Sequence, residues 1–351
     1  MRFGAQPSGV VERILDSASL LPTPLADTLV GAWLVRTIMV ASKLGIFDAL
    51  DARPLSASEV ARAQGTDPAA TEKLLRALVG AGYASCDAHE RYALTRMSRR
   101  WMRTKSALSL HDHMELMFIA WRWVEHYEEY VRTGRPLDVH TDLREGEWPT
   151  YQRGMQAIAR VSAPEVAART PLPRGATAML DVGGAHGFYS VALCRRHARL
   201  RSTILDLPEA VEASRPLLAA QGLGDRVVHR AGDARTHEYG EATYDLIFVS
   251  NLLHHFDEST NRDLMRRFAR ALRPGGSVVV QEIERVDARS TESQVGALGD
   301  LYFGMLSDSG TLAFSQVAGW QVEAGLAPRR PIRMFTLPGT GQQAARKSKA
   351  T

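Results

Sequence analysis

Cysteine is scarce in this chain, with only Cys86 and Cys194 among 351 residues. Two cysteines cannot form the disulfide framework of a small secreted domain, so we expect a reducing, cytoplasmic setting. No stretch approaches the roughly 18 apolar residues that a membrane-spanning helix needs, and the N-terminal residues contain no apolar signal region. The sequence therefore predicts a soluble protein with no membrane partner.

Concentrated positive charge is also missing. The 43 Lys and Arg residues nearly balance the 39 Asp and Glu residues, so charge gives no reason to expect nucleic acid as a partner. One locally basic stretch, 346–349, falls in residues 341–351, which we expect to be a flexible tail. No Cys-x-x-Cys or His-Glu-x-x-His motif is present, and His111 and His113 are weak ligand candidates, so no metal site is predicted.

Residues 1–105 contain the pattern of a winged helix. A strongly apolar helix is expected over 25–50, and Ser56 with Glu59 is typical of a helix N-cap. Pro68 opens the next helix, and the segments 83–85 and 92–94 then predict a small hairpin. A DNA-binding regulator would need basic residues on the second of these helices. Only Lys73 and Arg76 occur between 72 and 78, so we favour a dimer contact instead.

The rest of the chain changes from helices to alternating strands and helices. Residues 106–170 read as a helical linker, and residues 171–340 as an α/β domain. Five strands are expected there, at 178–182, 203–206, 226–229, 244–249 and 277–281. Helical segments separate most of them, which predicts a mostly parallel, Rossmann-like sheet covered on both faces.

A nucleotide site is expected behind the first strand. Gly183, Gly184 and Gly187 form a turn without side chains, where backbone can approach a ligand. Asp206 ends the second strand and can accept ribose hydroxyls, and Gly232-Asp233 follows the third strand and can reach adenine. The Gly-x-Gly-x-x-Gly spacing of a pyrophosphate site is absent. We therefore expect S-adenosylmethionine, which has no phosphate.

Together, Val182–Gly187, Leu205–Glu209, Gly232-Asp233, Leu253-His254 and Leu272–Gly276 resemble the small-molecule O-methyltransferases of the caffeate and acetylserotonin type. The resemblance implies a C-terminal methyltransferase domain with a seven-stranded sheet, an N-terminal winged-helix dimerisation domain and a homodimer. It also implies a small-molecule acceptor, an aromatic or polyketide-like natural product. The cofactor residues would be Asp181, Gly183, Gly184, Gly187, Asp206, Leu207, Gly232, Asp233 and Asn251.

The same resemblance assigns a general base to His254, oriented by Glu282, with Glu284 as a competing acid. A pocket histidine without a proton role remains the alternative. A second orienting acid of the family is missing from 310–315, and Asp308 is out of register. This departure leaves N- or C-methylation open, and also a reaction in which the cofactor is not a methyl donor.

The resemblance also implies an acceptor pocket, formed by the helical linker 106–170 and the segment after the fifth strand. Phe118, Trp121, Met155, His255, Tyr302 and Phe303 are its candidates, although any one of them could be a core residue. His186 stands inside the glycine turn, and we favour a solvent-facing position for it over a contact with the cofactor.

Overall fold

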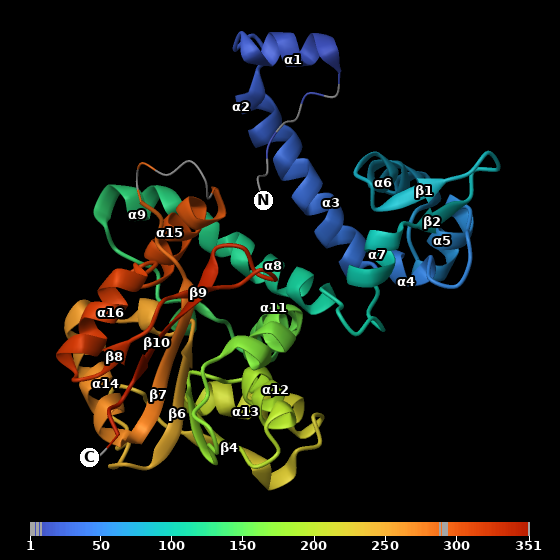
Figure 1. The fold of residues 1–351 in the computed structure, drawn as a ribbon. Coiled ribbons are helices and arrows are strands. Elements are labelled where there is room, and N and C mark those ends of the chain that lie inside the picture. The colour runs from blue at the N-terminus through green and yellow to red at the C-terminus, as the bar shows by residue number, and fades with distance from the viewer. Residues whose placement is uncertain (1–3, 5–6, 8, 288, 290–293, 350–351) are drawn as a thin grey trace. The chain divides into compact units, whose positions relative to one another are not determined.

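The structure is a computed structural model that describes residues 4, 7, 9–287, 289 and 294–349. The chain forms two compact units, which divide between Phe118 and Ile119. This division lies within helix α8 (His111–Val124), later than the boundary at 105 that the sequence suggested. Figure 1 shows the elements of both units, which are described separately below.

The N-terminal unit is a winged helix preceded by additional helices, as expected. The winged helix consists of α5 (Ala57–Gln64), α6 (Pro68–Gly80) and the antiparallel pair β1 (Ala84–Cys86) and β2 (Tyr92–Leu94). Its core includes the buried residues Phe47, Val60, Leu75 and Leu78. The remaining helices are α1 (Val10–Ser17), α2 (Thr23–Leu25), the π-helical η1 (Ala26–Val30), α3 (Gly31–Lys43), α4 (Ile46–Ala49) and α7 (Arg96–Trp101).

Local chemistry explains where these helices begin and end. Ser56 and Glu59 form a reciprocal capping box at the start of α5, which confirms the predicted N-cap. Asp67 accepts the backbone N–H of Ala70 and places Pro68 in the first turn of α6. The helix expected over 25–50 is interrupted at Gly45, whose φ of +67° is left-handed and ends α3 before α4 begins.

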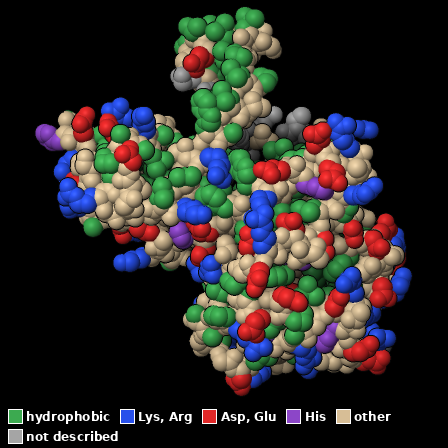
Figure 2. Space-filling view, turned by 180° about the vertical axis from the view of Figure 1, so that it is seen from behind, with side chains coloured by type: hydrophobic (Ala, Val, Ile, Leu, Met, Phe, Trp, Pro, Cys, Tyr) green, Lys and Arg blue, Asp and Glu red, His purple; other side chains and the backbone are tan. Residues whose placement is uncertain are grey.

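The helical run Thr23–Lys43 contradicts the expectation that no segment is long and apolar enough to span a membrane. It is long and apolar enough to do so by length and composition, and 17% of that apolar window is buried. Leu29 and Trp33 are 41% and 60% exposed, and Figure 2 shows hydrophobic side chains over the N-terminal helices. Such a surface favours contact with an apolar partner surface.

The C-terminal unit contains the predicted α/β sheet. The structure describes eight strands: β3 (Ala178–Val182), β4 (Arg201–Asp206), β5 (Val227–Ala231), β6 (Tyr244–Ser250), β7 (Leu272–Ile283), β8 (Ala327–Pro328), β9 (Ile332–Arg333) and β10 (Thr340–Arg346). The strand order is β5-β4-β3-β6-β7-β10-β8, with β9 also paired to β10. The first five strands are parallel, and β10 is antiparallel to β7. The short β8 and β9 therefore share one edge position of a seven-position sheet.

Helices cover both faces of this sheet (Figure 1). On one face Leu264, Phe268 and Trp320, from α14 (Glu258–Ala271) and α16 (Phe314–Glu323), join a core cluster with Val278 and Val280. On the other face Val166 of α11 (Trp148–Arg169) and residues of α12 (Phe188–Arg196) pack with Phe248 and Val279. The other helical elements of this unit are α9 (Tyr127–Thr133), α10 (Val139–Asp142), α13 (Pro208–Ala219), η2 (Gly224–Arg226), η3 (Leu253–His255) and α15 (Gln294–Leu306).

Residues 341–349 do not form the flexible tail that we expected over 341–351, whose last two residues lie outside the described part of the chain. Thr340–Arg346 form β10, which pairs along its whole length with β7 between Ser277 and Ile283. Lys347 then donates its Nζ to the carbonyls of Ala269 and Leu272, both at 2.8 Å, and so caps the C-terminus of α14. The polar sequence of this segment concealed an interior strand, because Gln342 and Gln343 are buried with hydrogen-bonded side chains.

Deleting β10 should therefore unfold the C-terminal unit. A chain that ends at Gly339 exposes the edge of β7 and removes the base on which β8 and β9 pair. We expect aggregation, or loss of the cooperative thermal transition measured by circular dichroism. A matched chain that ends at Lys347 keeps β10 and the cap of α14, and should melt within a few degrees of the full chain. Equal melting of both truncations would contradict the interior placement of β10.

Candidate active site

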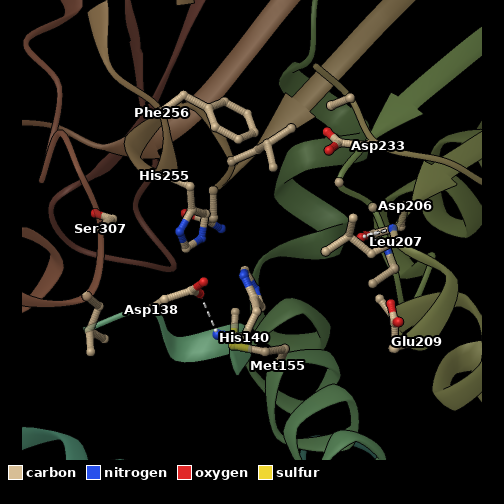
Figure 3. Close-up of a pocket in the computed structure, with 18 of the residues that line it drawn as sticks. Asp138, His140, Met155, Asp206, Leu207, Glu209, Asp233, His255, Phe256 and Ser307 are labelled. Carbon is tan, nitrogen blue, oxygen red and sulfur yellow. Dashed lines mark hydrogen bonds between the residues drawn. The ribbon is translucent and has the colours of Figure 1, made fainter. Parts of the chain in front are cut away.

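A cavity of about 760 Å³ opens at the carboxyl ends of β3, β4, β5 and β6. Every residue that lines it belongs to the C-terminal unit. Figure 3 shows Asp206, Leu207 and Asp233 at one end and His140, His255 and Ser307 toward the other. The carboxyl edge is where ligands bind in parallel α/β sheets, because the connecting loops diverge there.

The glycine turn forms the floor of the first end. Gly183 has a φ of +73° and Gly187 a φ of +69°, conformations that side chains disfavour. A Cβ at Gly184 would lie 2.5 Å from a carboxylate oxygen of Asp181, and one at Gly187 would lie 2.7 Å from Ile204. Gly183 and Gly184 line the cavity, where a ligand can approach. Gly187, also expected at the cofactor, is not on the wall and is required by the packing beneath the turn.

Asp181 differs from its expected place. It is 1% exposed, lies beneath the turn rather than on the cavity wall, and accepts the hydroxyl of Ser190 at 2.6 Å. Burial raises its pKa to about 7. Its role is to support the turn from below, because a buried carboxyl group needs fixed donors around it.

Asp206 stands at the end of β4 and lines the cavity. Its carboxylate accepts the backbone N–H groups of Ala185 at 2.9 Å and Leu207 at 2.8 Å, which hold it against the turn. Burial raises its pKa to about 6 even though both hydrogen bonds oppose that shift. Each oxygen keeps a further lone pair, so the carboxylate can still accept hydroxyl donors from a ribose.

The remaining predicted cofactor residues also line this end of the cavity. Gly232 and Asp233 follow β5, and Asn251 follows β6 with a positive φ of 51°. The Asp233 carboxylate is bound by Arg235 through the backbone N–H and the guanidinium, at 2.6–3.1 Å, and these hydrogen bonds lower its pKa. Asp233 is thus ionised but already paired.

The affinity for S-adenosylmethionine should depend on pH through Asp206. Only the carboxylate form can accept two hydroxyl donors, and its pKa is raised to about 6 in the free protein. Affinity should therefore be full above pH 7 and fall by up to about tenfold per unit below pH 6. Calorimetry with S-adenosylhomocysteine between pH 5 and 8 measures this. Asp206→Asn should bind weakly with a flat profile, and an equally steep profile in that variant would assign the titration elsewhere.

His254 and Glu282 form a buried pair behind the other end of the cavity. The Nδ1 atom of His254 lies 2.8 Å from Oε2 of Glu282, and the histidine is 3% exposed. The other oxygen of Glu282 accepts the backbone N–H groups of Leu252 at 3.0 Å and Leu253 at 2.9 Å. One carboxylate therefore fixes both the turn and the orientation of the imidazole, as in histidine-dependent catalytic sites.

The turn that carries His254 is anchored from its carbonyl side as well. Asn261, buried in α14, donates its Nδ2 to the carbonyls of Leu253 at 2.9 Å and Phe256 at 3.0 Å. The backbone N–H of Ser309 binds the carbonyl of His254 at 3.2 Å. Asn261 was not among the predicted site residues, although it lies eight residues after Leu253 on the buried face of the next helix.

The other end of the cavity, called the acceptor end because the acceptor is expected there, is built largely from aromatic rings. His140, Trp148, Tyr151, Met155 and His255 line it. The rings of His140 and Trp148 are stacked with centroids 5.7 Å apart, and the His140 and His255 rings lie 5.0 Å apart. Burial raises the pKa of Tyr151 to about 12, so its phenol stays protonated at neutral pH. The sequence predicted Met155 and His255 here but missed His140, Trp148 and Tyr151, which precede or begin α11.

Four expected pocket residues do not line the cavity. Phe118 lies in the N-terminal unit, where Arg36 and Lys43 approach its ring at 5.0 and 4.5 Å. Trp121, Tyr302 and Phe303 are also absent from the wall. Phe303 instead packs on His254, with ring centroids 4.7 Å apart. Its role is to support the histidine from behind, which a helical pattern could not distinguish from lining the cavity.

His186 also differs from expectation, because it lines the cavity instead of facing solvent. Its Nδ1 accepts the backbone N–H of Phe188 at 3.1 Å, and burial lowers its pKa to about 4. The ring is therefore neutral with its proton on Nε2. It presents a hydrogen-bond donor next to the glycine turn.

The acids around His254 can now be placed. Glu284 pairs with Arg333 at 3.4 Å, and only Glu282 of these two contacts His254. Asp308 and Ser307 line the cavity but show no contact with the imidazole of His254 among the described residues. The structure thus supplies one orienting acid, in agreement with the departure noted in 310–315.

His111 takes a structural role in the N-terminal unit. Its Nδ1 lies 3.1 Å from the hydroxyl of Ser42. Burial lowers the pKa of His113. The described part of the chain contains no group of three His, Cys, Asp or Glu side chains that could hold a metal ion.

Comparison with known proteins decides what this arrangement belongs to. Residues 128–311 match the family model of the O-methyltransferase domain, and residues 26–104 match the O-methyltransferase dimerisation domain. The chain belongs to the O-methyltransferase family. The second match covers residues 26–43 of the apolar helical run Thr23–Lys43, which fits a protein contact better than a membrane. This O-methyltransferase methylates hydroxyl groups with S-adenosylmethionine as its methyl donor.

Curated bacterial enzymes resemble the methyltransferase over most of its length. It is 28% identical to 3-hydroxy-5-methyl-1-naphthoate 3-O-methyltransferase of Streptomyces sahachiroi over 335 residues, covering 91% of this chain and 93% of the relative. It is 30% identical to 3-amino-4-hydroxybenzoate 4-O-methyltransferase of Streptomyces cremeus, covering 77% and 75%. Human N-acetylserotonin methyltransferase, solved with S-adenosylmethionine, shares the fold with a TM-score of 0.83, 20% identity and coverage of 98% and 100%.

The residues of the first end of the cavity fit the adenosyl group of this methyl donor. Gly183 and Gly184 have no side chains where a ligand must approach, and Asp206 offers an acceptor for ribose hydroxyls. Arg235, the one Lys or Arg among the described lining residues, is already bound to Asp233. When bound, S-adenosylmethionine supplies an electrophilic methyl group on a sulfonium. The six acids on the cavity wall, Asp138, Asp206, Glu209, Asp233, Asp257 and Asp308, suit its positive charge.

Proposed function

We propose that this enzyme methylates a phenolic hydroxyl of a small aromatic natural product, with His254 as the general base and Glu282 as its positioning acid. The observation that carries the proposal is the 2.8 Å contact between His254 Nδ1 and Glu282 at the carboxyl edge of β6. The aromatic lining at the acceptor end, and relatives that act on a hydroxynaphthoate and a hydroxybenzoate, support a flat aromatic acceptor.

The proton has a defined destination in this arrangement. Because Nδ1 of His254 donates to Glu282, Nε2 carries the lone pair and can accept the hydroxyl proton. The phenolate oxygen then forms the new bond to carbon while the bond from that carbon to sulfur breaks, and the imidazolium is stabilised by Glu282. His255 lines the cavity, whereas His254 is 3% exposed and lies behind the wall. Burial and the neighbouring histidines hold the pKa of His255 well below the usual range, so it is a poor base.

The test is turnover with a panel of phenols. We expect stoichiometric release of S-adenosylhomocysteine together with a methyl ether, identified by mass spectrometry and NMR. Formation of only N-methyl or C-methyl products would refute O-methylation as the reaction of this site. Release without any methylated product would refute methyl transfer altogether.

We further infer a cytoplasmic homodimer that is formed through the N-terminal unit. The dimerisation-domain match over 26–104 and the exposed side chains of Leu29, Val30 and Trp33 support this assembly. Light scattering of the purified chain at micromolar concentration should give a mass near twice 38.6 kDa. A monomer under these conditions would argue against it.

A further inference from the structure

We propose that the acceptor end recognises an uncharged oxygen substituent through His140 and His255 and discriminates against acceptors that carry a carboxylate. This inference rests on the proposed function, because it concerns the acceptor of that same site. The acceptor would then differ from those of the relatives that are named for a hydroxynaphthoate and a hydroxybenzoate, which both carry a carboxylate.

Two imidazoles on the acceptor wall have free hydrogen-bonding atoms. Within the described part of the chain, His140 is bonded only through its backbone N–H, to Asp138 at 3.0 Å, and no ring nitrogen of His140 or His255 has a hydrogen-bond partner (Figure 3). Ring contacts hold both side chains in place. Trp148 stacks on His140, and the ring centroids of His254 and His255 are 4.2 Å apart. Two oriented but unpaired polar rings facing a cavity indicate a polar group of the ligand between them.

The charge state of these rings favours a neutral partner. Burial lowers the pKa of His140, and burial together with the neighbouring histidines lowers the pKa of His255. Each ring is therefore neutral near pH 7 and offers one donor and one acceptor. This set matches a hydroxyl, carbonyl or amide oxygen, whereas two neutral rings supply no positive charge to offset that of a carboxylate.

The cavity wall also lacks a free cation. Arg235 is the one Lys or Arg among the described lining residues, and its guanidinium is already bound to Asp233 at the adenosyl end. Asp138 and Asp308 line the acceptor end, and neither forms an ion pair within the described residues. A carboxylate placed here would lose hydration without gaining a positive partner, which is strongly unfavourable.

The test compares two probes that differ in one group. The full-length chain loaded with S-adenosylhomocysteine is titrated at pH 8 with 3-hydroxy-1-naphthamide and with 3-hydroxy-1-naphthoate in a calorimeter. We expect the amide to bind at least about tenfold more tightly. Equal affinities, preference for the carboxylate, or no measurable binding of either probe would overturn the proposal. Because binding is measured without a methyl donor, failure of methyl transfer with an intact preference would refute only the proposed function.

Two kinds of variants assign the preference to residues. His140→Phe and His255→Phe keep the ring contacts but remove the polar atoms. Each should weaken amide binding by about three- to tenfold, as expected for the loss of one neutral hydrogen bond. Asp308→Asn removes a charge without a change of shape and should strengthen carboxylate binding about two- to fivefold while amide binding stays unchanged. Parallel effects on both probes in all three variants would contradict recognition of charge.

Discussion

Replacing His254 by alanine should lower kcat by about 10²–10⁴-fold while the affinity for S-adenosylmethionine stays nearly unchanged. The imidazole is oriented by Glu282 at 2.8 Å and is not on the wall of the adenosyl end. Its loss therefore removes proton transfer without removing a cofactor contact. Steady-state kinetics with a phenolic acceptor, together with calorimetry with S-adenosylhomocysteine, measures both effects.

His255→Ala is the matched control, because this neighbouring ring lines the cavity but has no acid partner. We expect it to raise KM for the acceptor more than it lowers kcat. If His255→Ala abolished kcat and His254→Ala left it near the wild-type value, the two roles assigned here would have to be exchanged.

Glu282→Gln tests how the acid acts. The variant can still accept the N–H groups of Leu252 and Leu253 through its carbonyl oxygen, but its amide nitrogen then faces Nδ1 of His254. Nδ1 then accepts a hydrogen bond from the amide, so the imidazole proton moves to Nε2. A protonated Nε2 has no lone pair with which to accept the proton of the hydroxyl. We expect a loss in kcat close to that of His254→Ala, with a preserved fold.

Replacing Asp206 by alanine should weaken the binding of S-adenosylmethionine by about 10²–10⁴-fold. Two hydrogen bonds to a charged acceptor contribute about 1.5–3 kcal/mol each, and ribose would lose both. The carboxylate also holds the N–H of Ala185 and of Leu207, so the turn 183–187 loses an anchor at the same time. Calorimetry above pH 7, where Asp206 is ionised, gives the full effect.

Asp233→Ala is the control for that experiment. Its carboxylate is already bound by Arg235 through the guanidinium and the backbone, so less of its hydrogen-bonding capacity is free for a ligand. We expect at most about a tenfold loss of affinity. An unchanged affinity of Asp206→Ala would remove the ribose assignment, and equal losses in both variants would place the adenosyl group differently.

Short-range signals made much of the fold predictable. Ser56 with Glu59, Asp67 with Pro68, and the five apolar strands each depend on neighbours within a few residues, and all are confirmed in the structure. The ends of the parallel strands then placed Asp206, Asp233, Asn251 and His255 on one cavity, because parallel strands share their carboxyl edge.

Tertiary packing decided the features that the sequence analysis misjudged. Asp181 is close to the turn in sequence but lies beneath it, because the burial of a carboxyl group depends on Ser190 of the following helix. Thr340–Arg346 read as a polar tail, yet its glutamines bond inside the sheet, so pairing with β7 outweighs composition. The expected pocket aromatics Tyr302 and Phe303 lie off the wall, while His140 and Tyr151 line it.

The sequence by itself determined the methyl-donor class and the position of the histidine turn, because glycine spacing and strand ends are local properties. Only the tertiary structure decided which groups face the acceptor. His140 and His255 are 115 residues apart along the chain (255 − 140), and only folding brings them together. It also decided that Glu282, rather than Glu284, orients His254. Residues two apart share a face of a strand, so alternation cannot separate these acids, but β7 ends at Ile283 and Glu284 beyond it pairs with Arg333.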